Sequence, residues 1–344
     1  MSGGTALLEV KNLKKYYPVK SKLSRKLLGQ VKAVDGISFS IQPGEVLGLV
    51  GESGCGKSTA GCTVLRLENA TSGEVWFEGQ EILSMDKRML KDIRKNMQMV
   101  FQDSYSCMNP KMTIQEIIRE PLVIYKMPRR EQNEKIGRLL ELVGLTREQG
   151  GRYPHELSGG QRQRAGIARA LALEPKLIIA DEPVSALDVS IQAQIINLMA
   201  DLKKELGLGY LFIAHDLSVV KHISDRIAVM YLGKIVEQCE KKELYASPLH
   251  PYTVSLLNAV PIPDPEIKKE RILLEGDLPS PIDPPSGCRF HPRCSGAKEC
   301  CRISEPQLRE VTPGHFAACH FAGGNVSETV SETVSEAVSE PGEV

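Results

Sequence analysis

The segment 51–59, with the sequence GESGCGKST, constrains the fold of this chain more than any other stretch. It fits the phosphate-binding pattern G-x-x-x-x-G-K-[ST], in which backbone N–H groups and the lysine hold phosphates and the hydroxyl coordinates Mg²⁺. The apolar run 46–50 before it predicts a buried strand, and 59–67 can open a helix whose N-terminus adds positive charge. The candidate phosphate and Mg²⁺ residues of this loop are Gly51, Ser53, Gly54, Cys55, Gly56, Lys57, Ser58 and Thr59.

Charge and hydropathy narrow the possible environments of the chain. Basic and acidic residues are equal in number, 43 of each, so the chain lacks the electrostatic footprint of a nucleic-acid-binding protein. No apolar run reaches the roughly 18 residues that cross a bilayer, and the N-terminus shows no secretory signal. We therefore expect an intracellular chain that reaches a membrane only through a partner.

The region before the phosphate loop has the pattern of an antiparallel sheet. Residues 7–13 and 33–41 read as strands, and the basic stretch 20–32 between them reads as a loop. Tyr16 and Tyr17 follow the first strand. One of these tyrosines could stack on an adenine ring, although an ordinary half-exposed strand aromatic is an equally good interpretation.

A helical insertion interrupts the α/β pattern after Gln102, which ends a short apolar strand. Apolar residues recur at helical spacing from 112 to 145. The sequence LSGGQ at 157–161 then opens the basic helix 162–173. A Ser-Gly-Gly helix start offers free N–H groups to an anion, so the chain carries a second candidate anion site.

Two further apolar strands end in candidate catalytic residues. The unbroken run 177–180 ends in Asp181 and Glu182, and the run 210–214 ends in His215. Such strands are buried on both faces of a parallel sheet, whose functional groups lie at the carboxyl ends. Asp181 is then placed to hold Mg²⁺ through water, Glu182 to polarise an attacking water and His215 to contact a γ-phosphate. The competing interpretations are a surface acid pair and a structural histidine.

Taken in order, these motifs resemble the ATP-binding subunits of ABC transporters over about residues 7–321. The Ser-Gly-Gly-Gln sequence is the discriminating motif, because other P-loop ATPases lack it. The resemblance implies an α/β fold, with a P-loop ABC ATPase core, an antiparallel β subdomain and a helical subdomain. It also implies that ATP on one subunit is closed by the Ser-Gly-Gly-Gln segment of a partner subunit.

The resemblance assigns roles to single residues. Tyr17, rather than Tyr16, would stack on adenine, and Glu182 would be the general base. Gln102 and His215 would contact the γ-phosphate, with Gln102 also linking it to the transmembrane partner. The Mg²⁺ ligands would be Ser58, Gln102 and Asp181. The residues contributed across the dimer would be Ser158, Gly159, Gly160, Gln161 and Asp188.

The segments 50–56, 181–194 and 250–253 resemble the oligopeptide/dipeptide importer branch more narrowly, and its second ATPase subunit in particular. This implies a heterodimer with another ABC ATPase subunit, two transmembrane permease subunits and, indirectly, an extracellular solute-binding protein. The expected location is the cytoplasmic face of the cell membrane. Relatives carry nickel, glutathione or other solutes, so a non-peptide cargo is an alternative. A soluble ABC ATPase acting on DNA or ribosomes is a further one, which the neutral charge and single nucleotide domain disfavour.

After residue 257 the chain becomes rich in proline and then in cysteine. The spacing Cys288-x5-Cys294-x6-Cys301-x17-Cys319 lacks the short pair of a structural zinc site but suits four thiolates around a [4Fe–4S] cluster. The importer branch carries this pattern, and a cluster has been attributed to it. Zinc and free buried thiols remain the alternatives, while Cys300, His315 and His320 are expected to be spare or structural.

These patterns divide the chain into regions. We expect an ABC nucleotide-binding domain at 1–258, with its helical subdomain at about 103–173, followed by a Pro/Cys-rich extension at 259–322. The end of the chain, 323–344, repeats the motif Val-Ser-Glu and is small, polar and acidic. Such a composition predicts a disordered tail.

Overall fold

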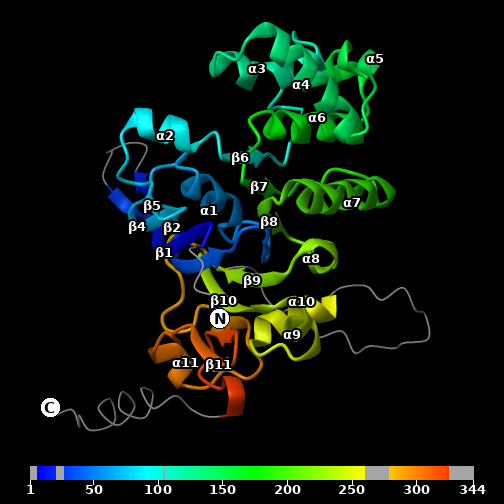
Figure 1. Cartoon of the computed structure of the whole chain (residues 1–344). Helices are drawn as coiled ribbons and strands as arrows, with labels where there is room; N and C mark the ends of the chain where they lie inside the picture. Colours follow the sequence, from blue (N-terminus) through cyan, green and yellow to red (C-terminus); the bar gives the residue numbers. More distant parts are fainter. Residues whose placement is uncertain (1–5, 21–26, 104, 260–278, 325–344) are drawn as a thin grey trace, which may run out of the picture.

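The computed structural model describes residues 6–20, 27–103, 105–259 and 279–324. An eight-stranded sheet with the order β11-β12-β10-β9-β3-β8-β7-β6 runs through the middle of the molecule (Figure 1). Strands β9, β3, β8, β7 and β6 are parallel, while β10, β12 and β11 continue the sheet in antiparallel fashion. The bounds are β3 (Val46–Val50), β6 (Met97–Val100), β7 (Leu177–Asp181), β8 (Gly209–Ala214), β9 (Arg226–Tyr231), β10 (Lys234–Glu240), β11 (Arg309–Thr312) and β12 (His315–Ala317).

The apolar runs that predicted strands form the centre of this sheet. Every residue of β3, β7 and β8 is buried, as expected for parallel strands covered on both faces. The parallel strands end at one edge of the sheet, where the polar residues that follow them lie. Helices packed along the sheet are α1 (Lys57–Val64), α7 (Val189–Leu206), α8 (Leu217–Ile223), α9 (Lys241–Ala246) and α10 (Pro251–Ala259).

A second, four-stranded antiparallel sheet with the order β2-β1-β4-β5 lies beside α1. Its bounds are β1 (Leu8–Lys20), β2 (Leu27–Ile41), β4 (Ser72–Phe77) and β5 (Gln80–Glu81). The prediction of a basic loop at 20–32 is wrong for residues 27–32, because β2 already begins at Leu27 and Tyr17 pairs with Val31. The strand pairing satisfies the backbone of 27–32, while residues 21–26 of the predicted loop lie outside the described ranges.

The helical insertion forms a separate layer above the sheet, at the top of Figure 1. Its apolar stripe is buried as the periodicity predicts, with Ile117, Ile118, Leu122, Ile136 and Leu140 inside. The helices of this part are α3 (Ile114–Ile124), α4 (Arg129–Leu142), α5 (Arg147–Gly150) and α6 (Gly159–Leu171), with a 3₁₀ turn at Pro154–Glu156. Helix α2 (Lys87–Ile93) precedes β6 and lies on the side of the four-stranded sheet (Figure 1).

The cysteine-rich extension attaches to the core by extending its sheet. In β12, Ala317 pairs with Glu237 of β10, and the fully buried Glu237 carboxylate receives N–H bonds from Leu249 and His250, each at 2.8 Å. His315 lies 2.7 Å from the same carboxylate. The extension also contains α11 (Cys300–Ile303) and 3₁₀ turns at His291–Arg293 and Ala322–Gly324.

Some sequence predictions concern residues outside this description. These are the first part of the proline-rich stretch, at 260–278, and nearly all of the repeat tail, at 325–344. Within the described ranges, no helix combines the length and the apolar character needed to cross a bilayer.

Candidate nucleotide site

A cavity of about 330 Å³ opens where β3 meets α1, beneath the hairpin of β1 and β2. Many of the predicted residues line it, namely Tyr17, Ser53, Gly54, Cys55, Gly56, Lys57, Ser58, Thr59, Gln102 and Glu182. The loop is tightly packed from behind: a Cβ on Gly51 would lie 2.1 Å from the Met230 oxygen, and one on Gly56 would lie 1.9 Å from the Ala33 oxygen. Both positions also have positive φ, so glycine is required at each.

Lys57 begins α1 and turns its amino group back into the loop. Its Nζ donates to the carbonyl oxygens of Gly51 and Glu52, at 2.8 and 2.9 Å. The first turn of α1 contains no acidic residue, and Gly56 at its N-cap supplies no side-chain acceptor. The N–H groups at this end of α1 and the buried ammonium therefore form a setting suited to phosphate oxygens.

Ser58 and Asp181 come together from α1 and the end of β7. The Ser58 hydroxyl donates to an Asp181 carboxylate oxygen at 2.8 Å. Burial raises the pKa of Asp181, and the Ser58 hydrogen bond acts in the opposite direction. A hydroxyl and a carboxylate are hard oxygen ligands of the kind that Mg²⁺ prefers, so this pair fits the metal.

Three polar side chains meet where β6, β7 and β8 end. The Gln102 amide donates to Oε2 of Glu182 at 3.1 Å, and Nδ1 of His215 lies 3.1 Å from the same oxygen. Glu182 has a φ of +43°, a left-handed conformation that a non-glycine side chain adopts at some cost. The structure thus gathers the predicted catalytic residues around one carboxylate.

The two adjacent tyrosines of β1 have different surroundings. The Tyr16 hydroxyl donates to the Asp35 carboxylate, away from the loop. Tyr17 lines the cavity, and the Lys15 ammonium lies 4.5 Å from the centre of its ring. Tyr17 is therefore the aromatic ring available beside the phosphate loop.

The remaining predicted residues lie outside this cavity. Ser158 and Gln161 close the first turn of α6 in a reciprocal cap, with N···O distances of 3.3 and 3.0 Å. Gly160 packs so closely on Ile191 that a Cβ would lie 2.6 Å from its side chain, which places this turn against the start of α7. Asp188 precedes α7 and is exposed. These residues form a surface of their own on the same chain.

Several residues that contact the loop or the cavity were not predicted from the sequence. Arg293 of the extension makes a two-bond ion pair with Glu52, and Arg289 pairs with Asp35. Pro281 also lines the cavity. These contacts join residues more than 200 positions apart, and Glu52 occupies a variable position of the loop motif, so no local pattern could have indicated them.

The four predicted cysteine ligands all lie in the described part of the extension, where Cys301 is buried and the other three are partly buried. Burial raises the pKa of Cys288 to about 12, with further increases from Cys301, Cys319 and Cys294. The pKa of the Cys300 thiol is also raised, first by burial and then by its neighbour Cys301. A partly buried set of four thiols has the donor chemistry of an iron–sulfur or zinc site, because a bound cation would favour the thiolates that burial disfavours.

A second set of potential metal ligands is the buried group Glu237, Cys239 and His315, whose ligand atoms lie within 4.8 Å of one another. The Glu237 oxygens already accept two backbone N–H bonds and contact His315. We therefore interpret this group as the structural joint between β10 and β12.

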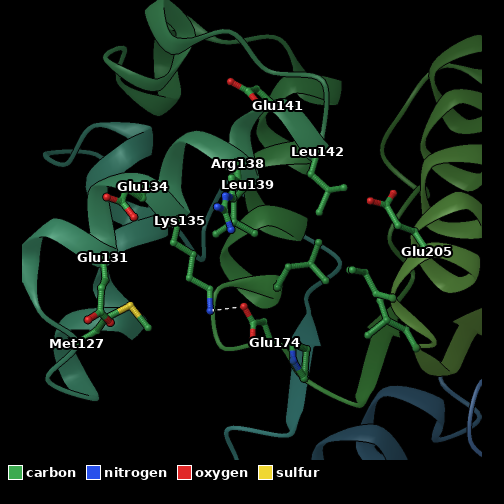
Figure 2. A pocket seen from close by; sticks show the side chains of 14 residues that line it. Met127, Glu131, Glu134, Lys135, Arg138, Leu139, Glu141, Leu142, Glu174 and Glu205 are labelled. Atoms are coloured by element: carbon green, nitrogen blue, oxygen red, sulfur yellow. Dashed lines mark ion pairs between the residues drawn. The ribbon is translucent and has the colours of Figure 1, made fainter.

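A larger hollow, of about 860 Å³, lies between α4 and the end of α7. Figure 2 shows its lining, in which charged side chains alternate with Leu139 and Leu142 and Lys135 pairs with Glu174 at 2.7 Å. None of the predicted site residues lines it. This hollow is a junction between the helical layer and the sheet layer and plays no part in the site described above.

Family models and curated relatives match both the ATPase core and the C-terminal part of this chain. The family model described as ABC transporter matches residues 34–185, and the one described as oligopeptide/dipeptide transporter, C-terminal region, matches 236–301. The chain is 57% identical over 318 residues to the oligopeptide transport ATP-binding protein AppF of Bacillus subtilis, covering 91% of this chain and 97% of that one. It is 51% identical to the dipeptide transport ATP-binding protein DppF of Haemophilus influenzae, covering 92% and 96%.

Solved structures give the same picture for the ATPase core. A dimeric ATP-binding cassette in a post-hydrolysis state, bound to ADP and Pi, superposes with a TM-score of 0.60 at 28% identity, covering 68% of this chain and 98% of that one. The protein cbiO1 of Clostridium perfringens, part of an ABC transporter complex, gives 0.61 at 27% identity, covering 71% and 92%. The predicted α/β cassette fold is therefore confirmed.

Proposed function

Because this chain belongs to the ABC transporter family, among the ATP-binding subunits of its oligopeptide and dipeptide transporters, we propose that it energises peptide import as one of two different ATPase subunits. The pair would act on two permease subunits at the cytoplasmic face of the membrane, with an external solute-binding protein delivering the cargo. The observation that carries this is the identity of more than half of the residues over nearly the full length, extension included. Nickel or glutathione import is the alternative.

The separation of two anion-binding helix starts on this chain supports a composite ATP site. The P-loop lies in its cavity, while Ser158, Gln161 and Asp188 form a separate surface. In our proposal the Ser-Gly-Gly-Gln turn closes the ATP site of the partner ATPase, and the partner's turn closes the site on this chain. The capped turn of α6 offers its N–H groups to the phosphates across that interface.

Within the site, each side chain has a task that its geometry suits. Tyr17 would stack on adenine, Lys57 and the loop N–H groups would hold the phosphates, and His215 would orient the γ-phosphate. Mg²⁺, held by Ser58, Gln102 and Asp181, would supply charge that stabilises the transferring phosphoryl group. Glu182 would accept a proton from the attacking water. Catalysis would rest on positioning and electrostatic stabilisation.

A groove beside Gln102 suits the permease contact. It has a volume of about 550 Å³ and is lined by Leu67, Phe101 and Ile124. Leu67 and Ile124 are exposed, so an apolar cytoplasmic segment of a permease would bury them. Since Phe101 immediately precedes Gln102, movement of such a segment would reach the γ-phosphate side of the site directly.

Reconstitution with both permeases, the second ATPase and the binding protein should give ATP-dependent uptake of labelled di- and oligopeptides into vesicles. Vesicles with AMP in place of ATP are the control. Uptake of nickel or glutathione but no peptide would correct the cargo. If the chain stays in the soluble fraction of cells that contain its partners, the transport proposal fails.

We further propose that Cys288, Cys294, Cys301 and Cys319 hold a [4Fe–4S] cluster. Anaerobically purified protein should then contain about four irons per chain and absorb broadly near roughly 400 nm. Cys294→Ser should lose most of the iron and colour, whereas Cys300→Ser, the matched control beside Cys301, should keep them. One zinc per chain and no colour would instead assign a structural zinc site.

A further inference from the structure

The extension reaches the phosphate-binding loop through a well-defined ion pair. The two terminal nitrogens of Arg293 donate to the two carboxylate oxygens of Glu52, at 2.8 and 3.1 Å. The Arg293 side chain is only 8% exposed, and that of Glu52 24%. A two-bond, largely buried pair of this kind has a fixed geometry, unlike most surface ion pairs.

Glu52 is itself built into the loop. Its N–H donates to the Tyr252 hydroxyl at 2.8 Å, and its carbonyl accepts from Lys57 Nζ at 2.9 Å. Its carboxylate is therefore a negative charge inside the loop that receives a polyphosphate. Glu52 does not line the cavity itself but directly precedes Ser53, which does, so without a counter-charge its carboxylate would disfavour a polyphosphate through space.

The extension also touches the cavity on its adenine side. Arg289 donates to Asp35 and to the Leu232 carbonyl, and Asp35 accepts the hydroxyl of Tyr16, the neighbour of Tyr17. The Pro281 carbonyl accepts an N–H bond from Lys32 at 3.0 Å, and both residues line the cavity. The extension therefore contacts the phosphate-binding loop at Glu52 and lines the cavity at Pro281.

We propose that Arg293 is a positioning residue of the ATP site, which neutralises Glu52 and holds the phosphate-binding loop in its ligand-receiving form. This inference rests on the proposed function in placing the triphosphate at the loop 51–59. Arg293 lies in the turn His291–Arg293, between Cys288 and Cys294. The cysteine site and the ATP site thus share one turn of the chain.

The charges of the two residues predict whether each variant binds ATP more weakly or more tightly than the wild type. Arg293→Met leaves Glu52 uncompensated and should weaken binding of a fluorescent ATP analogue by about tenfold. Glu52→Gln removes the repelling charge, so its affinity should equal or exceed that of the wild type. The double variant, with both charges removed, should return to within about threefold of the wild type. The KM for ATP should follow these affinities, with kcat changing less.

The alternative is that the pair only stabilises the fold. Both single variants would then weaken binding, and the double variant would not recover it, which would overturn the proposal. Unchanged affinity in Arg293→Met would also overturn it. Arg302→Met, an exposed arginine of the same extension, is the matched control and should bind like the wild type.

Two further measurements keep the test decisive. If Arg293→Met does not fold, as judged by circular dichroism, Glu52→Gln alone decides: weaker binding than the wild type refutes the charge argument, and equal or tighter binding supports it. Wild-type protein that binds no ATP analogue at all would instead refute the nucleotide site itself.

Discussion

Replacing Glu182 by glutamine should preserve ATP binding and lower ATP turnover by at least about a hundredfold. Glutamine keeps the size of the side chain and an oxygen that can accept the Gln102 hydrogen bond. It cannot take a proton from the attacking water. The variant should therefore bind ATP and close with its partner ATPase without completing the cycle, which single-turnover hydrolysis and equilibrium binding measured together would show.

Glu141→Gln provides the control for this experiment, because Glu141 is an exposed glutamate on α4. It should leave both binding and turnover unchanged. Full ATPase activity in Glu182→Gln would exclude Glu182 as the general base. A parallel loss of ATP affinity would instead indicate that the carboxylate mainly holds Gln102 and His215 in place.

Replacing Lys57 by alanine should weaken ATP binding by about ten- to a hundredfold, the cost of losing a charge-assisted hydrogen bond to phosphate. Lys57 is buried and donates to two carbonyls of its own loop, so alanine also removes a brace of the loop. Binding of a fluorescent ATP analogue should show the loss of affinity directly. The unfolding temperature should fall only slightly.

Lys242→Ala, which changes an exposed lysine of α9, is the matched control and should bind ATP normally. Unchanged ATP affinity in Lys57→Ala would contradict the P-loop assignment. Since Lys57→Ala acts on binding and Glu182→Gln on turnover, the pair of variants separates the two parts of the proposed mechanism.

The sequence predicted the centre of the fold, and which polar residues lie near one another at its edge, because both depend on local patterns. Apolar runs such as 46–50 and 177–180 predict buried strands, and in a parallel sheet the polar residues that follow such strands lie at one edge. The meeting of Gln102, Glu182 and His215 follows from this topology alone.

What the sequence could not predict depends on distant parts of the chain. The contact between Arg293 and Glu52 joins residues 241 positions apart, and neither residue type is unusual where it stands. Residues 27–32 are predicted as a loop from the sequence because no local pattern marks them as a strand, and only their pairing with β1 reveals it. Ion pairs and strand pairs between distant residues produce no recognisable pattern in a short stretch of sequence.

The pairing of β12 with β10 also affects how the protein is made. Without β12, the outer edge of β10 would present free N–H and C=O groups, together with the buried carboxylate of Glu237, and such edges promote aggregation. The strand that covers this edge is translated long after β10. During synthesis this edge of the sheet therefore stays open until β12 has left the ribosome, and a chain truncated before β12 would keep the edge open.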